Sequence, residues 1–368
     1  MIKPHIAVRY ACITCLLFFA IGSGIPSQVE GSTNLQLELA IVAKDVARFL
    51  KGRGEDSIAI GQFTGPPQLA ATSGPGIIHV LTQELKKQKI EVKRRAKLGI
   101  KGEYRDVLDA KSNQLAAEIK GDIVDRSGEV LLSFSRGIFG DATLSSMFGA
   151  TVQLTPDATV KARDQELINS LDNPRVTIRK HSIRTAPGSP YALQILVKQG
   201  DDYEPLKPQD KEDLAFVSLK RDQQYAVRLI NDSKHDAGVT LTIDGLNAFT
   251  FSENQGYTQF VIPAGTTGLI EGWHRTNDVS DAFQVTEYAK SAAAELNQAG
   301  GSLGTITASF SAAWETDQSV PADEPPSPNQ FSRAADATGR GPKVDAGFNE
   351  VARRFGVIRG AVSVRYTR

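Results

Sequence analysis

Apolar and polar residues alternate over residues 225–230 and again over residues 238–243, on either side of a polar break at residues 231–236. Period-two alternation on both sides of a turn-rich break is typical of two half-buried antiparallel strands. The pattern therefore predicts a β-hairpin, which leads through a second turn at residues 244–247 towards Trp273.

The same kind of pattern extends over most of the second half of the chain. Short strands separated by Gly, Asn, Asp and Pro predict an antiparallel β-sandwich domain over residues 191–314. A helical insert is expected at residues 288–296, a disordered loop rich in Pro, Asp and Ser at residues 315–341, and a strand that returns to the sandwich within residues 342–368. The other expected strands are 191–198, 215–219, 248–251, 258–262, 268–273, 282–286 and 304–314.

Residues 34–156 show a mixed pattern instead. Apolar residues at three- and four-residue spacing predict helices over residues 35–50, where Gly52 would form a left-handed C-terminal cap, and over residues 73–85. Strands are predicted at residues 57–63, 90–92, 98–104, 114–124 and 129–135, with a short helix at 141–148. This order predicts an amino-terminal α/β sandwich domain, an α+β fold for the whole chain, and a linker at residues 157–190.

The first residues have the layout of a secretory signal peptide over residues 1–24. Lys3 and Arg9 precede an apolar run at residues 11–21, and small residues follow. A retained membrane anchor is the alternative, although the run is shorter than the ~20 residues that span a bilayer. Cleavage would remove both cysteines, Cys12 and Cys15, and would make the protein secreted or periplasmic.

Charge and motifs exclude several classes of function. The chain has 42 basic and 42 acidic residues, so no field of the whole protein attracts nucleic acid. No later apolar run is long enough to span a membrane. The sequence contains no Gly-x-Ser-x-Gly elbow, no His-Glu-x-x-His and no cysteine-based site in the expected mature chain. We therefore expect neither catalysis nor a cofactor.

The first half resembles a family of bacterial envelope proteins that includes the curli secretion-channel lipoprotein, activators of penicillin-binding proteins and the TolB amino-terminal domain. The helix at residues 39–50, the strands at 58–63 and 101–104, and the turn at 123–128 carry the likeness. The chain lacks a usable lipidation cysteine and the insertions that would form membrane hairpins, so pore formation is not implied. The resemblance implies an adaptor domain without catalytic residues.

The second half is similar to an uncharacterised β module of secreted bacterial proteins. Residues 225–231, 242–247 and 272–276 carry this likeness, and residues 282–283 and 304–306 extend it. The likeness implies a fold and no activity.

One end of the predicted hairpin stretch is a candidate ligand surface: Trp273, His274, Arg275, Asp244 and Asn247. An indole offers a large face for a sugar or a peptide. The alternative is that Trp273 fills the core while His274 and Arg275 point to solvent. Asp244 and Asn247 fit either a turn or a calcium ligand pair, and Asp244, His274 and Asp278 are the residues from which a hydrolase would be built.

A dense run of positive charge is the second candidate surface: Lys86, Lys87, Lys89, Lys93, Arg94, Arg95 and Lys97. Such a run is typical of a solvated helix end, or of a contact with anionic lipid, polysaccharide or nucleic acid. The glycine-containing loop at residues 61–76 precedes a helix, as phosphate-binding loops do. It lacks the lysine of a P-loop, so a strand-to-helix connection is the simpler interpretation.

Taken together, these patterns predict a non-enzymatic binding or assembly protein of the cell envelope, with envelope proteins or cell-wall polysaccharide as partners. The alternatives are a carbohydrate- or peptidoglycan-binding module that uses Trp273–Arg275, and a hydrolase.

Overall fold

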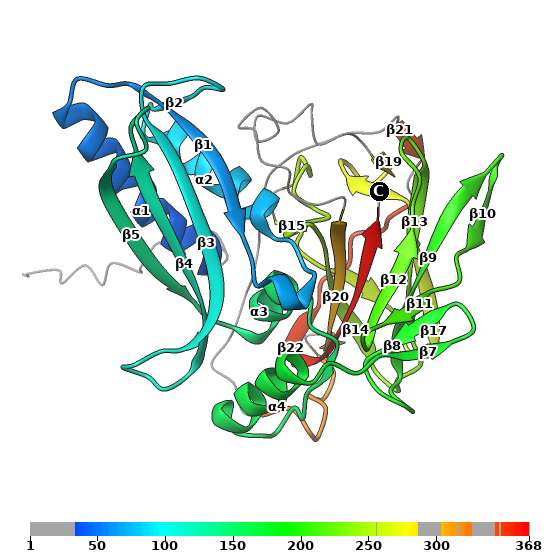
Figure 1. Cartoon of the computed structure of the whole chain (residues 1–368). Helices are drawn as coiled ribbons and strands as arrows, with labels where there is room; N and C mark the ends of the chain where they lie inside the picture. The colour runs from blue at the N-terminus through cyan, green and yellow to red at the C-terminus, as the bar shows by residue number, and fades with distance from the viewer. Residues whose placement is uncertain are drawn as a thin grey trace, which may run out of the picture.

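A computed structural model describes residues 34–254, 256–285, 303–315, 317–325, 343–345 and 347–367. The chain forms a layered α/β unit followed by two packed β-sheets, so the predicted α+β fold is confirmed (Figure 1). The expected helical insert at residues 288–296 and most of the expected loop at 315–341 lie outside the described residues.

The sheet of the α/β unit consists of β1 (Ser57–Thr64), β2 (Glu91–Val92), β3 (Gly99–Leu108), β4 (Leu115–Val124) and β5 (Val130–Ile138). Its spatial order is β2–β1–β3–β4–β5. β1 pairs in parallel with β2 and β3, and the remaining pairs are antiparallel. All of these strands lie where the alternation of apolar residues predicted them.

Two helices, α1 (Asn34–Gly52) and α2 (Gly74–Lys87), cover one face of this sheet (Figure 1). Their apolar stripes, which include Leu39, Leu50 and Ile77, are buried with Ile58 and Ile119 of the sheet in one core. The predicted cap, Gly52, lies two residues before the residue with the left-handed conformation. Gly54, and not Gly52, has the left-handed conformation with φ of 71°, because α1 continues through Gly52.

The predicted linker at residues 157–190 is regular structure. The helix α4 (Val160–Asp172) packs with α3 (Asp141–Phe148), and its Leu167 belongs to the core of the α/β unit. β7 (Thr177–Arg179) and β8 (Ser182–Arg184) form a hairpin that joins the sandwich. Composition predicts a linker because charged residues and prolines surround these elements, although the sequence also predicts a short helix at residues 164–171 and an edge strand at residues 176–178 within it.

One sheet of the sandwich follows the order β18–β19–β13–β9–β8–β7, and β10, β17 and β21 attach beside it. Its further strands are β9 (Tyr191–Gln199), β10 (Asp202–Pro205), β13 (Gln224–Asn231), β17 (Thr266–Ile270), β18 (Gly272–His274), β19 (Val279–Gln284) and β21 (Lys343–Asp345).

The second sheet follows the order β11–β12–β22–β20–β14–β15, and β6 and β16 attach beside it. It consists of β6 (Val152–Gln153), β11 (Gln209–Lys211), β12 (Leu214–Ser218), β14 (Asp236–Ile243), β15 (Leu246–Asn247), β16 (Phe260–Ile262), β20 (Leu303–Trp314) and β22 (Arg354–Thr367). The strand expected at residues 248–251 is a turn, in which the Thr250 amide donates to the Asn247 carbonyl.

The predicted hairpin of β13 and β14 is wrong. β13 pairs with β9, β17 and β19, whereas β14 pairs with β15, β16 and β20 in the other sheet. The two strands contribute Val227 and Leu241 to the same core from opposite sides. The polar break between them is a corner that crosses from sheet to sheet, and alternation alone does not distinguish such a corner from a hairpin turn.

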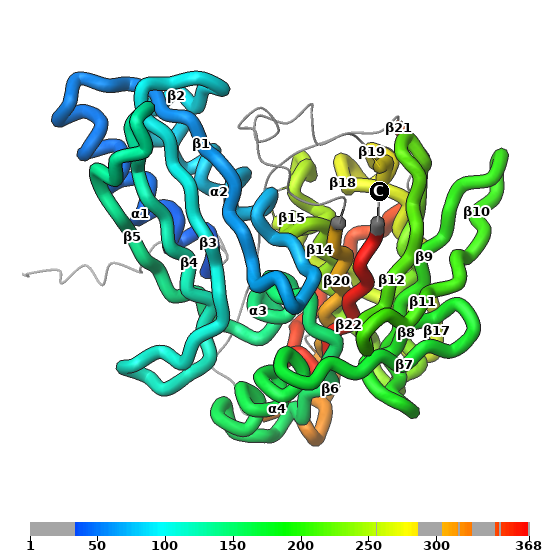
Figure 2. The backbone as a smooth tube through the Cα atoms, in the orientation of Figure 1, coloured from blue at the N-terminus to red at the C-terminus, as the bar shows by residue number. Residues whose placement is uncertain are grey.

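The final strand, β22, was predicted and lies inside its sheet instead of at an edge. It pairs with β20 along most of its length and in parallel with β12, so it runs between them (Figure 2). Near its middle, at Gly360 and Ala361, it also pairs with β6, which follows α3. The end of the chain therefore connects both parts of the molecule.

The two parts meet at a junction of hydrogen bonds. The Thr72 amide donates to Thr305 Oγ1 at 3.0 Å, and the Gly76 amide donates to the Asp244 carbonyl at 3.1 Å. The Arg365 guanidinium is buried there. It donates to the carbonyl of Leu69, which is the last residue of the 3-10 turn η1 (Pro67–Leu69). These bonds occupy the loop that resembled a phosphate cradle.

Candidate functional site

Trp273 lies in the core of the sandwich. Its side chain is 6% exposed and makes edge contacts with the rings of Phe251 and Phe283, at centroid distances of 5.3 Å each. The indole is therefore covered by protein and is not open to a sugar. This agrees with the alternative prediction that Trp273 fills the core.

His274 is also buried, which the sequence did not indicate. Its Nδ1 lies 3.1 Å from Ser252 Oγ, and its ring contacts Phe249, Tyr257 and Phe348. Burial among these rings lowers the pKa of His274, and a hydrogen bond to the Asn277 side chain opposes the shift. The neutral imidazole is thus the stable form, which suits packing more than proton transfer at the surface.

Arg275 is partly buried and lies between two acids. Its guanidinium is 3.7 Å from the Glu253 carboxylate and 3.9 Å from the Asp281 carboxylate. These contacts hold the segment after β18 against neighbouring strands. Of the three adjacent candidates, none presents a free functional group to solvent in the part of the chain that the structure describes.

Asp244 lies in the turn between β14 and β15, Asn247 is the last residue of β15, and both side chains make hydrogen bonds within the protein. The Asp244 carboxylate accepts hydrogen bonds from the Thr305 amide and from the Tyr366 hydroxyl, both at 2.8 Å. Asn247 Nδ2 donates to the Thr258 carbonyl at 3.0 Å. Within the described ranges, no group of three acidic, histidine or cysteine side chains could hold a metal ion, so the calcium interpretation has no support there.

The three residues named for a hydrolase lie in different settings. Asp244 bonds within the junction, His274 bonds to Ser252, and Asp278 is exposed in the turn between β18 and β19.

The feature that the structure adds is a cleft of about 1480 Å³ that is lined by residues of both sheets of the sandwich. β16 of one sheet and β17 of the other form its base. The segment at residues 347–356, which leads into β22, forms its opposite wall.

Most of the cleft surface is apolar and aromatic. Phe348 stacks obliquely on Phe260 at 5.5 Å and on His274 at 5.4 Å, which fixes the wall to the base. Val320 and Val351 lie on the rim and are 50% and 46% exposed. The large apolar and aromatic lining residues are Phe249, Tyr257, Phe260, Val261, Ile262, Leu269, Ile270, Trp314, Val320, Phe348, Val351 and Phe355.

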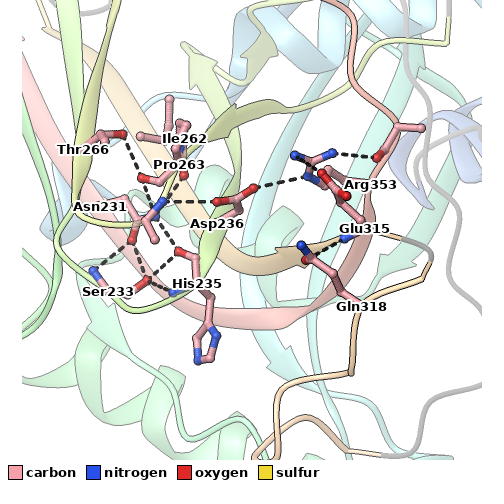
Figure 3. A network of polar contacts seen from close by, with 12 residues as sticks. Asn231, Ser233, His235, Asp236, Ile262, Pro263, Thr266, Glu315, Gln318 and Arg353 are labelled. Atoms are coloured by element: carbon pink, nitrogen blue, oxygen red, sulfur yellow. Dashed lines mark hydrogen bonds and ion pairs between the residues drawn. The ribbon is translucent and has the colours of Figure 1, made fainter.

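Charged groups at one end of the cleft are already paired. Arg353 Nε lies 3.2 Å from Asp236 Oδ2, and its Nη2 lies 3.0 Å from Glu315 Oε1, so the guanidinium bridges the two acids (Figure 3). Beside them, the buried amide of Asn231 donates to the carbonyls of His235 and Ile262 (Figure 3). This network fixes the corner between β13 and β14 and one end of the cleft with it.

A second ion-pair cluster fixes the short segment at residues 321–325 to β22. Arg359 donates to both oxygens of Asp323 and, at 3.0 Å, to Glu324. Glu324 also accepts the Val357 amide and lies so close to Gly356 that a Cβ there would overlap its carboxylate. Glu324, Pro325 and Gly356 all line the cleft, so this cluster shapes its rim.

Sequence reasoning missed this cleft. Its wall at residues 347–356 comes from the stretch 342–368, which the pattern predicts only as a strand that returns to the sandwich. Phe348 and Val351 were the available signal, since single apolar residues in a polar stretch next to a strand frequently pack against it.

The basic run is exposed, as expected, at the far end of the α/β unit. Three of its cations form ion pairs: Lys87 with Glu84, Lys93 with Glu91, and Lys97 with Glu55. The described helices include none of the length and apolarity needed to cross a membrane.

Comparison of the chain with protein-family models, with curated proteins and with solved structures gives no significant match.

Proposed function

We propose that this protein is a non-enzymatic binding and assembly protein of the bacterial cell envelope, secreted or periplasmic, and that its cleft receives an apolar segment of a protein partner. The observation that carries the proposal is the aromatic cleft between β16, β17 and residues 347–356. The expected signal peptide and the resemblance of the first half to envelope adaptors support the location.

The dimensions of the cleft favour a polypeptide segment over a small molecule. Small-molecule pockets usually have volumes of about 300–1,000 Å³, and this cleft has about 1480 Å³. Its rim also carries exposed apolar side chains, since Val320 and Val351 are about half exposed beside the ion-paired Glu324. Exposed apolar groups next to an apolar base extend the contact area beyond the cleft, which suits a macromolecular partner.

The state of the polar groups supports binding more than catalysis. Arg353 bridges Asp236 and Glu315, and Glu324 is occupied by Arg359 and the Val357 amide. A catalytic acid or base must exchange a proton with substrate, whereas these groups hold the walls in place.

Site-specific photo-crosslinking in the living cell tests the proposal. A photoreactive residue placed at Val320 or at Val351 should form covalent products with the same envelope protein. Leu108 is a matched control, since it is an exposed aliphatic residue in β3 (56% exposed) that lies outside the cleft lining.

Products from the two cleft positions should disappear when Phe348→Asp is introduced, because a charge in the aromatic wall opposes apolar packing. Identical products from all three positions, or none from the cleft positions, would contradict the proposal. Thermal unfolding of the Phe348→Asp chain, compared with the parent chain, separates loss of the partner from loss of the fold.

A further inference from the structure

At the end of the α/β unit that points away from the sandwich, α1 and α2 both end, together with the loop after β2 and the turn between β4 and β5 (Figure 1). The sequence places cations on each of these segments. We call this surface the basic end. Its cations are Lys51, Arg53, Lys86, Lys87, Lys89, Lys93, Arg94, Arg95, Lys97 and Arg126.

Direct contacts show that these segments meet. Lys51 Nζ donates to the Gln88 carbonyl at 3.3 Å, which joins the ends of α1 and α2. Lys97 Nζ lies 2.8 Å from Glu55 Oε1, which joins the loop after β2 to the segment after α1. Arg53, Lys97 and Arg126 line one recess of about 380 Å³ together with Glu55, Leu98 and Asp125.

Positive charge predominates at the basic end. Its segments carry ten cations and six carboxylates, which leaves an excess of four positive charges. The acids are Glu55, Asp56, Glu84, Glu91, Asp125 and Glu129. Cations near the ends of α1 and α2 also stabilise the helix dipoles. That explanation does not extend to Arg94, Arg95 and Arg126, which lie outside both helices.

We propose that the basic end docks the protein on an anionic phospholipid bilayer. A bilayer presents many headgroups in one plane, and each cation within a Debye length of it adds to the attraction. The basic end suits a planar partner because its cations come from helix ends and turns that reach the same side of the molecule, opposite the junction with the sandwich (Figure 1).

Two other anionic partners fit less well. A single free phosphate in the recess would meet Glu55 and Asp125 as well as Arg53, Lys97 and Arg126. Single-stranded nucleic acid is bound by cations interleaved with exposed aromatic rings. The large exposed apolar residues in the described ranges are all aliphatic, and the ring of Phe49 is covered by the Arg53 guanidinium at 4.8 Å. This proposal does not depend on the cleft.

Vesicle co-sedimentation of residues 25–368, which retain every described residue, tests the proposal. The chain should bind vesicles of phosphatidylcholine with about 30% phosphatidylglycerol and not vesicles of phosphatidylcholine alone. Raising the salt from about 0.05 M to about 0.5 M should release it. The triple variant Lys86→Glu, Arg95→Glu, Arg126→Glu should bind the anionic vesicles at least tenfold more weakly, because it reverses charge on three segments of the basic end.

The matched control is Lys207→Glu, Lys220→Glu, Lys234→Glu, which makes the same change in net charge at exposed positions of the sandwich. This control should keep most of the binding. Equal loss in both variants, or no binding of the parent chain to anionic vesicles, would overturn the proposal. Fluorescence anisotropy with inorganic polyphosphate and with single-stranded DNA gives a further check, since tight binding of either without vesicle binding would identify a different partner.

Discussion

Asn231 is the residue on which the corner between the two sheets depends. It is completely buried, and its amide donates to the carbonyls of His235, Ile262 and Pro263 while its Oδ1 accepts from Ser233. No other side chain of this size offers both donors and an acceptor in this geometry. Asn231 is thus the last residue of β13, and its hydrogen bonds hold the corner that leads to β14.

We expect Asn231→Ala to lower the free energy of unfolding by about 3 kcal/mol, because buried carbonyls lose their donors. Denaturant unfolding measures the change. Asn169→Ala, at an exposed position of α4, is the control and should change stability by less than about 0.5 kcal/mol. If the two substitutions lower the free energy of unfolding equally, the hydrogen bonds of Asn231 contribute no more to stability than an exposed asparagine does.

His79 of α2 is a second buried polar residue, and it makes stability depend on pH. Burial and the nearby Lys86 charge lower the pKa of His79 to about 4. Because the unfolded chain binds the proton more tightly, the neutral ring contributes its full stability above pH 6.5. This contribution is lost as the pH falls from 6.5 to about 4.

Between pH 7 and pH 4.5, the parent chain should lose roughly 2 to 3 kcal/mol more stability than His79→Gln. The comparison cancels the titration of other groups that both chains share. His181→Gln, a change at a partly exposed histidine, should follow the parent chain. If all three chains lose the same stability, His79 does not control the acid response.

At the scale of elements, the ion pairs of Arg359 fix a segment without regular structure to β22. Glu324 is 2% exposed in its side chain and depends on Arg359 for a counter-charge. Arg359 also lowers the pKa of Asp323 by hydrogen bonding and by its charge. Asp323 therefore stabilises the fold above its unfolded pKa of 3.8, and this contribution is lost as the pH falls through its lower folded value.

We expect Arg359→Met to destabilise the protein by about 3–5 kcal/mol at neutral pH, because it leaves Glu324 buried without a partner. The same substitution at the exposed neighbour Arg354 should cost less than about 1 kcal/mol. Adding Glu324→Gln to Arg359→Met should recover part of the loss. If the double variant is no more stable than Arg359→Met, then the packing of the Arg359 side chain, and not its charge, holds the segment.

For the whole molecule, we expect the junction to couple the unfolding of the α/β unit to that of the sandwich. Gly76 is in close contact with Gly245, and a Cβ at Gly76 would come within 2.6 Å of the Gly245 carbonyl oxygen. The Gly76 amide also donates to Asp244. The α/β unit and the sandwich can therefore approach each other this closely only because position 76 has no side chain.

The parent chain should unfold in one calorimetric transition, and Gly76→Ala should lower the stability by about 2 kcal/mol and separate the transition into two. Gly99→Ala is the control, since a Cβ there meets no atom nearer than 3.9 Å. A single unchanged transition in the Gly76→Ala chain would show that the junction contributes little to cooperativity.

The sequence by itself determined the elements whose pattern is long and regular. The helix α1, the strands of the first sheet and β22 were all predicted, because a period of 3.6 or 2 shows which face of an element is buried. It also predicted the exposure of the basic run, since charged side chains remain in water unless they are paired.

Tertiary structure alone decided how these elements are combined. The same alternation fits a hairpin and also fits two strands in facing sheets. The hydrogen bonds of Asn231 at the corner, which the alternation does not show, decide for the second arrangement. The candidate ligand surface at Trp273 is buried because Phe283 of the neighbouring strand β19 and Phe251 of the turn before β16 pack against the indole, and the alternation of residues does not show which face these rings cover. The cleft likewise depends on Phe348 and Arg353 meeting residues about a hundred positions earlier, and periodicity along a chain carries no information about such contacts.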